Sequence, residues 1–269
     1  MSGGRLTLVG TGYMLAGQVT QQSLSAITKA EKLFHLTAEA ATSVWIAGLN
    51  PTAESLHDAY AEGKPRRDTY LEMVERMLAP VRRGLAVCAA FYGHPGVLVF
   101  PAREAIRRAR AEGYEARMLP GVSAVDCLFA ELGVDPGTDG CQMYDATAFL
   151  YRRRRFDPAS PLILWQPGFI AVESILPLGG VHGGAGLRVL TEVLLRDYPP
   201  GHEVVLYEAA RLPVLGPVIA RFPLRELAEA HVTGRSTLYV PPLGPAEYDY
   251  DIVERLLPPH PGTGGEPTP

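Results

Sequence analysis

The residues best suited to chemistry lie between Tyr60 and Tyr70, where two phenols flank Arg66 in a loop that leads into a helix. A fixed guanidinium charge favours phenolate and lowers the pKa of a phenol from its ordinary value of about 10. A phenol placed in this way can act as a general base. The same spacing also fits two rings that pack beside an arginine pointing to solvent, and spacing alone does not separate the two interpretations.

A second candidate site is the loop of Gly10 and Gly12, which follows a strand-like segment at residues 6–9. Glycine leaves room for a ligand close to the backbone, so the loop fits a binding site as well as a bare turn. Gly17 falls too late to complete G-x-G-x-x-G, which excludes the dinucleotide fingerprint. The seven histidines show no H-E-x-x-H motif and the three cysteines no C-x-x-C pair, so we expect no metal site.

Composition and charge exclude several classes of protein. The 269 residues are 47% hydrophobic and 20% charged, enough for one large or two modest globular domains. A net charge of −4 argues against nucleic-acid binding, and the four arginines at 152–155 are interpreted as a solvated turn rather than a docking patch for an acidic partner. The odd cysteine count predicts a reducing, cytoplasmic location. No signal peptide or spanning segment is recognisable, so we expect no membrane partner.

The order of elements predicts an α/β fold with two lobes. Strands at 6–9, 85–91 and 114–119 alternate with helices at about 20–34, 69–83 and 102–112, which is typical of a parallel sheet covered by helices. Thr69 and Glu72 have capping-box spacing, which places Tyr70 in the first turn of its helix. A second set of elements follows residue 135. We therefore predict an N-terminal lobe at 1–122, a C-terminal lobe at 123–243 and a partly disordered tail at 244–269.

Several stretches together resemble the borosin peptide backbone α-N-methyltransferases, which belong to the tetrapyrrole methylase superfamily. The borosin resemblance depends mainly on Tyr60, Arg66, Tyr70 and Tyr92 occurring together. The wider resemblance runs from about residue 6 to residue 242 and is carried by residues 9–12 (VGTG), 91–97 (FYGHPGV), 118–130 (MLPGVSAVDCLFA), 164–166 (LWQ), 207–210 (YEAA) and 236–242 (STLYVPP).

The resemblance implies a two-lobed tetrapyrrole-methylase-like fold that binds S-adenosyl-L-methionine in the cleft between the lobes and assembles as a homodimer. Helix-start N–H groups and small residues suit the charged end of this cofactor. By position, the cofactor-binding residues are Gly10, Gly12, Tyr92, His94, Val97, Ser123, Ala124, Gln166, Ala209, Ser236 and Thr237.

The implied reaction transfers a methyl group from a sulfonium to a main-chain amide nitrogen. Because the lone pair of this nitrogen is delocalised into the carbonyl, the enzyme must remove the N–H proton or stabilise the imidate-like form. Our hypothesis makes Tyr70 the base, rendered more acidic by Arg66, which also stabilises charge on the substrate carbonyl oxygen. Tyr60 would orient the amide, and Tyr92 would hold the methyl donor in line.

Two departures from the fungal borosin pattern affect the interpretation. His57 stands where the fungal members carry a further tyrosine, and residues 244–269 contain no apolar core-peptide segment. We therefore expect a split enzyme that methylates a separate precursor peptide in trans, in the biosynthesis of a ribosomal peptide product. Two alternatives stay open: a superfamily methyltransferase acting on a porphyrinoid or other small molecule, and a cofactor-binding module without catalysis.

Overall fold

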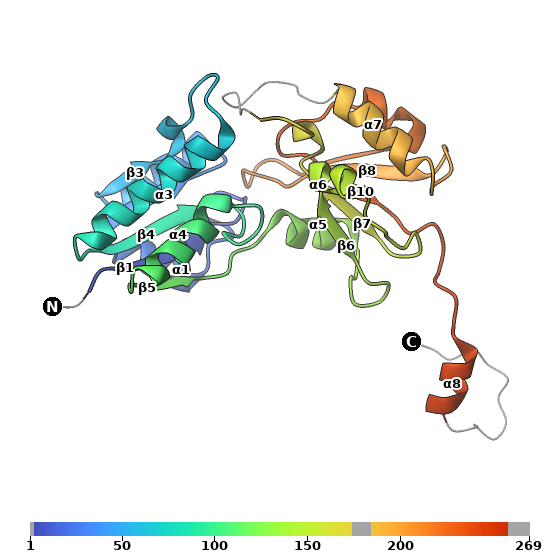
Figure 1. Ribbon diagram of the computed structural model, residues 1–269, viewed down its shortest axis with the longest axis horizontal. Helices are drawn as coiled ribbons and strands as arrows, with labels where there is room; N and C mark the ends of the chain where they lie inside the picture. The colour runs from blue at the N-terminus through green and yellow to red at the C-terminus, as the bar shows by residue number, and fades with distance from the viewer. Residues whose placement is uncertain (1–2, 174–183, 258–269) are drawn as a thin grey trace.

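The first lobe is built on a parallel sheet. The computed structural model describes residues 3–173 and 184–257 (Figure 1). The strand order of this sheet is β3-β2-β4-β1-β5, and each neighbouring pair runs parallel, as the alternation of strands and helices predicted. Its strands are β1 (Arg5–Gly10), β2 (Lys32–Leu36), β3 (Ala53–Ser55), β4 (Ala86–Phe91) and β5 (Glu115–Met118).

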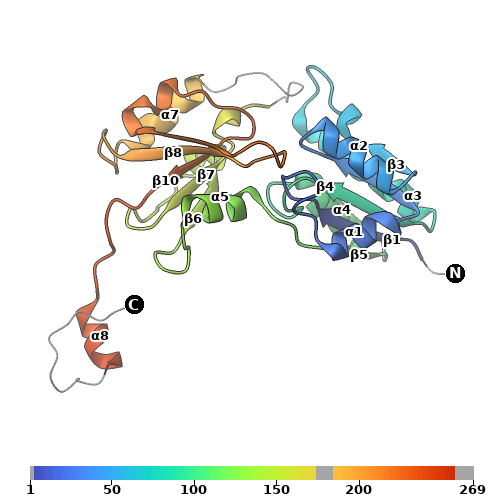
Figure 2. The same cartoon turned by 180° about the vertical axis from the view of Figure 1, so that it is seen from behind.

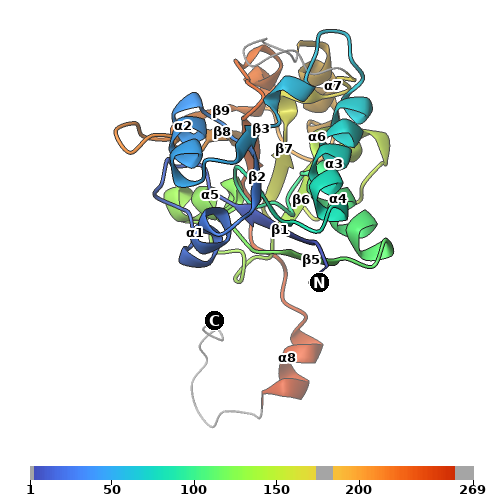
Figure 3. The same cartoon turned by 90° about the vertical axis from the view of Figure 1, so that its left-hand side faces the viewer.

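Helices cover both faces of this first sheet. Helices α1 (Gln21–Thr28) and α2 (Ala40–Leu49) lie on one face, and α3 (Arg66–Arg82) and α4 (Phe100–Ala111) lie on the other (Figures 2 and 3). Side chains of β1 alternate accordingly, since Leu6 and Leu8 pack in the α3–α4 cluster and Val9 packs in the α1–α2 cluster. Each fully buried leucine of this kind stabilises the fold by about 1.5–3 kcal/mol.

The prediction of a helix at residues 20–34 is wrong for the second half of that range. Helix α1 ends at Thr28, and β2 begins at Lys32. The Asn50 side chain ends the helix, because its amide donates to the carbonyls of Ile27 and Ala30 at 2.9 Å each. Phe34, predicted on the helix, packs instead against the α3–α4 side of the sheet.

The second lobe carries a mixed sheet with strand order β6-β7-β10-β8-β9. Strands β6 and β7 are parallel, whereas the remaining pairs are antiparallel. One face is covered by α6, α7 and the 3-10 helix η3, and the other by α5. The elements are α5 (Ala124–Leu132), β6 (Gln142–Asp145), α6 (Ala146–Tyr151), β7 (Leu162–Trp165), α7 (Gly184–Leu194), β8 (Glu203–Glu208), β9 (Val218–Pro223), η3 (Leu224–Glu229) and β10 (Thr237–Val240).

Helix α8 (Tyr250–Leu256) stands apart from both lobes (Figure 1). The segment that leads to it leaves the second lobe where the N–H of Leu243 donates to the carbonyl of Pro158 at 2.8 Å. Residues 258–269 of the predicted tail lie outside the described residues. None of the helices in the described residues combines the length and the apolar character that a membrane span requires.

Strand ends from both sheets meet where the lobes join. Strands β1 and β4 end there in the first lobe, and β7 ends there in the second. Because β10 runs antiparallel to β7 and β8, its first residue, Thr237, pairs with Trp165 and Tyr207 at the ends of those strands. Ligands commonly bind outside the carboxyl ends of strands in α/β sheets. The lobe junction is therefore the expected position of a ligand site.

The buried thiol of Cys88 gives a testable dependence of stability on pH. Cys88 lies in β4 with 1% exposure, and burial raises the pKa of its thiol to about 12. Because the pKa is raised in the folded state, the protonated thiol contributes to stability. This contribution is complete below the ordinary thiol pKa and is lost as the pH rises through the folded value. Between about pH 9 and pH 11, the free energy of unfolding should fall by about 1 kcal/mol per pH unit more in the wild type than in Cys88→Ala. Urea denaturation at each pH measures this, and equal slopes would contradict it.

Candidate active site

Arg66 and Tyr70 form a hydrogen-bonded pair on one face of α3. The helix begins at Arg66, directly after Pro65, so the two residues lie four positions apart and face the same side. The Arg66 Nε donates to the Tyr70 Oη at 2.8 Å, and the guanidinium carbon lies 5.7 Å from the centre of the Tyr70 ring. Arg66 therefore does not simply point to solvent beside packed rings.

Tyr60 and Tyr92 lie close to this pair. Tyr60 follows the 3-10 helix η1 (His57–Ala59), and Tyr92 follows β4. Burial raises the pKa of both phenols, the neighbouring Tyr70 raises them further, and the positive charge of Arg66 partly opposes the rise. The structure thus brings together all four residues predicted as catalytic. With raised pKa values, Tyr60 and Tyr92 stay protonated near neutral pH and can donate hydrogen bonds.

Arg66 also ties the two lobes together. Its Nη2 donates to the Gln166 Oε1 at 3.3 Å, and its backbone N–H donates to the carbonyl of Glu173 at 3.0 Å. Gln166 follows β7 and has a φ of +57°, a left-handed conformation that a residue with a side chain rarely adopts. Such strain persists where the surroundings enforce it, often at functional sites. The second lobe therefore supplies part of the support for Arg66.

A cavity that opens to solvent lies at the lobe junction beside Tyr92. Eight of the predicted cofactor residues line it: Tyr92, His94, Val97, Ser123, Ala124, Gln166, Ser236 and Thr237. Sequence reasoning missed the other lining residues, which are Tyr13, Gly93, Leu98, Val99, Val125, Trp165, Gly234 and Arg235. Within residues 3–173 and 184–257, no group of three histidine, cysteine or acidic side chains is arranged to hold a metal ion.

The other predicted cofactor residues, Gly10, Gly12 and Ala209, do not line the cavity. A Cβ atom at Gly10 would lie 2.4 Å from the carbonyl oxygen of Gly93, and one at Gly12 would lie 2.3 Å from the Gln18 Cβ. Gly10 thus allows close approach of the segment at Gly93, and Gly12 allows close approach of Gln18. Ala209 packs against the buried cluster beside α5.

Tyr13 belongs to the cavity wall because Gln18 fixes the loop that carries it. The Gln18 Oε1 accepts the N–H groups of Tyr13 and Met14 at 2.7 and 3.1 Å, and its Nε2 donates to the Cys127 Sγ at 3.2 Å. The Tyr13 ring meets the Tyr92 ring edge-on, with 5.7 Å between ring centres. Its place directly after the glycine loop was the one signal in the sequence that could have identified it.

The start of α5 forms another wall. The Ser123 hydroxyl donates to the Asp126 Oδ2 at 2.7 Å, and the same carboxylate accepts the Ser123 N–H at 2.6 Å. In this capping box the hydroxyl of Ser123 is already hydrogen-bonded to the first turn of α5. The first-turn backbone N–H groups of Ala124 and Val125, which the helix itself cannot satisfy, are thus the donors available at this wall.

The turn at residues 233–236 forms a further part of the wall, and Glu208 holds it. The Glu208 Oε1 accepts hydrogen bonds from the hydroxyls of Thr233 at 2.5 Å and Ser236 at 2.7 Å. The Arg235 Nε lies 3.6 Å from the Glu208 Oε2, too far for a hydrogen bond, and is buried without a hydrogen-bond partner in the described parts of the chain. Arg235 therefore has an N–H group that a ligand in the cavity can satisfy.

Comparison with solved structures confirms the predicted two-lobed fold. The uroporphyrin-III-C-methyltransferase from Thermus thermophilus matches with a TM-score of 0.60 at 19% identity, over 95% of this chain and all of that one. The cobalt precorrin-4 methyltransferase matches with a TM-score of 0.62 at 15% identity, over 88% of this chain and 94% of that one. At these identities the likeness shows the fold alone.

Sequence comparison confirms the resemblance to borosin proteins. The chain is 44% identical over 257 residues to the methyltransferase/gymnopeptides precursor of Gymnopus fusipes and 42% identical over 257 residues to the methyltransferase/omphalotin A precursor of Omphalotus olearius. Each match covers 94% of this chain but 61% of the relative, so the chain spans about three fifths of the length of these proteins. A type III borosin precursor of Anomoporia bombycina is 41% identical over 89% of this chain and 28% of its own length.

The profile of the Tetrapyrrole (Corrin/Porphyrin) Methylases matches residues 5–213, most of both lobes. This match includes β1, the glycine loop, Arg66, Tyr70 and most of the cavity wall. The sequence match and the two-sheet architecture agree, and the chain belongs to the tetrapyrrole methylase family.

Proposed function

We propose that the protein is an S-adenosylmethionine-dependent methyltransferase that N-methylates backbone amides of a separate ribosomal precursor peptide. The observation that carries this proposal is the Arg66–Tyr70 pair, hydrogen-bonded at 2.8 Å and tied to Gln166 in the cavity wall. The names of the borosin relatives, which describe a methyltransferase joined to a cyclic peptide precursor, support a peptide substrate.

The cavity fits the methyl donor in the chemistry of its lining. Aromatic faces attract a sulfonium and can stack on an adenine, and Tyr13, Tyr92 and Trp165 supply three such rings. The Arg235 Nε is ion-paired with Glu208 but makes no hydrogen bond to the described residues. This N–H and the first-turn N–H groups of α5 suit a carboxylate. When bound, S-adenosylmethionine supplies an electrophilic methyl group.

The residues around Arg66 are arranged to handle the amide proton and the charge on the amide oxygen. The Tyr70 Oη accepts an N–H from the Arg66 guanidinium, and this phenol oxygen is the group that takes the amide proton in our proposal. Among the described residues, Tyr70 and Gln166 engage two of the five side-chain N–H donors of Arg66, and the others can donate to the amide oxygen. Tyr60, kept protonated by burial, can donate a hydrogen bond that orients the peptide.

We also propose that the peptide arrives as a separate molecule and that the enzyme is a homodimer. Helix α8 stands away from the cavity, on the far side of the second lobe (Figure 1). Its apolar side chains Tyr250, Ile252 and Leu256 are 63%, 41% and 73% exposed, and a second copy could cover them. Light scattering coupled to gel filtration tests the dimer.

Mass spectrometry tests the proposed reaction. The purified chain is incubated with S-adenosylmethionine and the peptide encoded by a small reading frame next to its own gene, and the peptide is then fragmented. Increments of one methylene mass on backbone nitrogens of that peptide are expected. A parallel incubation replaces the peptide with uroporphyrinogen III. Methylation of the porphyrinogen alone would overturn the peptide assignment and favour the small-molecule alternative.

Replacing Glu208 should weaken binding of the donor product, S-adenosylhomocysteine. Glu208→Ala removes the acceptor of two hydroxyls that hold the turn at 233–236, so we expect the Kd to rise about tenfold. Isothermal titration calorimetry measures this change. The matched control is Glu203→Ala, at the far, exposed end of the same strand, which should leave the Kd unchanged. Equal Kd values for the two variants would contradict the role of Glu208.

A further inference from the structure

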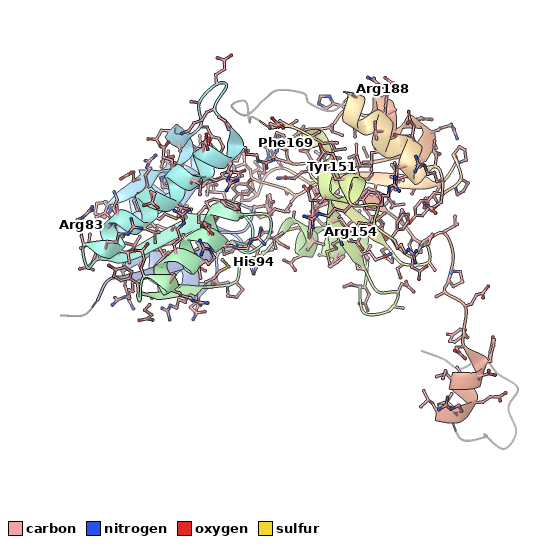
Figure 4. All side chains as sticks on the ribbon, in the orientation of Figure 1. Arg83, His94, Tyr151, Arg154, Phe169 and Arg188 are labelled. Atoms are coloured by element: carbon pink, nitrogen blue, oxygen red, sulfur yellow. The ribbon has the colours of Figure 1, made fainter. Side chains whose placement is uncertain are left out.

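A short segment of the second lobe holds the Arg66 guanidinium from the side opposite α3. The guanidinium carbon lies 5.5 Å from the centre of the Phe169 ring, which belongs to the 3-10 helix η2 (Pro167–Phe169). The segment at 166–173 also accepts the Arg66 Nη2 through Gln166 and the Arg66 backbone N–H through Glu173. Figure 4 shows Phe169 where the two lobes meet.

Two ring faces restrict the guanidinium. Tyr70 lies 5.7 Å from it within α3, and Phe169 lies 5.5 Å from it across the junction. An arginine side chain has many rotamers, and fixing it for catalysis costs conformational entropy. A cation held over aromatic rings is stabilised there, which offsets part of that cost before substrate binds.

The position of the Phe169 ring is set in turn by the cavity wall. A Cβ atom at Gly234 would lie 2.5 Å from the Phe169 Cε2 and 2.6 Å from its Cζ. A Cβ atom at Gly168 would lie 2.5 Å from the carbonyl oxygen of Thr233. The segment of Phe169 therefore packs closely on the turn at 233–236, and Gly234, Arg235 and Ser236 of that turn line the cavity.

We propose that Phe169 is a positioning residue that fixes the Arg66 guanidinium against Tyr70 and joins it mechanically to the turn at 233–236. This inference rests on the proposed function, since it assigns Phe169 to the reaction that Arg66 serves. A contiguous series of contacts then runs from the cavity wall through Gly234 and Phe169 to Arg66. Phe169 does not itself line the cavity and touches the chemistry only through Arg66.

A role in the stability of the core alone predicts a different pattern of effects. Phe169 is only partly buried, and the buried clusters of the described residues do not include it. If the ring served packing alone, its loss would lower the unfolding midpoint, the donor affinity and the rate together. If it positions Arg66, the rate should fall while S-adenosylhomocysteine binding stays near the wild-type value.

The test uses Phe169→Leu, which keeps an apolar side chain but removes the ring face. We expect kcat for peptide methylation to fall about tenfold, with KM for S-adenosylmethionine and Kd for S-adenosylhomocysteine within about twofold of wild type. Wild-type kcat, or parallel losses of kcat and affinity, would overturn the proposal. Failure of the wild type itself to methylate the peptide would instead count against the proposed function.

Nuclear magnetic resonance gives a readout that needs no turnover. The Arg66 Nε–H resonance, identified by its disappearance in Arg66→Lys, should move downfield in Phe169→Leu as the shielding ring is lost. Gly234→Ala reaches the ring from the other side and should displace it, so it should shift the same resonance and lower kcat. In the Phe169→Leu background, Gly234→Ala should add little, because the smaller side chain leaves room for the new methyl group. An unchanged Arg66 Nε–H resonance in both single variants would contradict the proposal.

Discussion

Replacing Tyr70 by phenylalanine is expected to lower kcat at least about 100-fold while leaving the Kd for S-adenosylhomocysteine within about twofold of the wild-type value. The substitution removes only the phenol oxygen, which accepts the Arg66 Nε–H at 2.8 Å. Without that oxygen, the guanidinium loses the phenol that we propose takes the amide proton. The cavity is lined without Tyr70, so binding of the donor should survive. Single-turnover methylation and calorimetry separate the two effects.

The matched control is Tyr114→Phe, since Tyr114 is also a partly buried tyrosine packed on the α3–α4 cluster. It lies away from the lobe junction, directly before β5, and its loss of a hydroxyl should leave both kcat and Kd unchanged. The assignment of Tyr70 as the base fails if Tyr70→Phe turns over as fast as the control. A fall in kcat accompanied by an equal loss of donor affinity would indicate a structural role instead.

The Arg66–Tyr70 arrangement was partly predictable because it depends on local spacing. The sequence places the two residues four positions apart but predicted Arg66 in the loop before a helix that starts near Thr69. Because α3 begins at Arg66 instead, both residues lie on one face of the helix. Tyr60 and Tyr92 lie near the Arg66–Tyr70 pair only because of the fold. The family resemblance, not the local sequence, predicted that they belong to the same site. The contacts of Gln166 and Phe169 with Arg66 span about a hundred residues of sequence and had no local signal.

Strands bounded by glycines were easier to predict than a strand that follows a helix closely in sequence. Strand β4, apolar throughout and bounded by Gly84 and Gly93, was predicted within a residue of its bounds. Strand β2 was mistaken for the end of a helix because Ile27, Ala30 and Phe34 happen to follow helical spacing. The Asn50 side chain, which ends α1, comes from a later helix end. A side-chain cap from another element leaves no mark in the local pattern.

The neighbours of Gly10 give it a steric role in the glycine loop, which by sequence fitted a ligand site as well as a bare turn. The atoms nearest to a Cβ there belong to the backbone of Gly93 and Gly121 and to the Pro95 ring. A Cβ atom there would lie 2.4 Å from the Gly93 carbonyl oxygen and 2.8 Å from the Gly121 Cα. Three chain segments thus cross at Gly10, and two of them lead directly to His94 and Ser123 in the cavity wall.

Gly10→Ala should therefore destabilise the protein strongly and also disrupt the cavity. Overpacking in a core commonly costs about 1–3 kcal/mol, and backbone atoms relax less than side chains do, so we expect a loss of about 3 kcal/mol or more. Urea denaturation measures it as a lower midpoint, and weaker S-adenosylhomocysteine binding should accompany it. Gly48→Ala is the matched control, because a Cβ atom at Gly48 in α2 meets nothing within 4 Å. Alanine favours a helix by about 1 kcal/mol over glycine, so the control should stabilise the protein. If both variants unfold at the wild-type midpoint, the crossing of backbones at Gly10 does not limit the site.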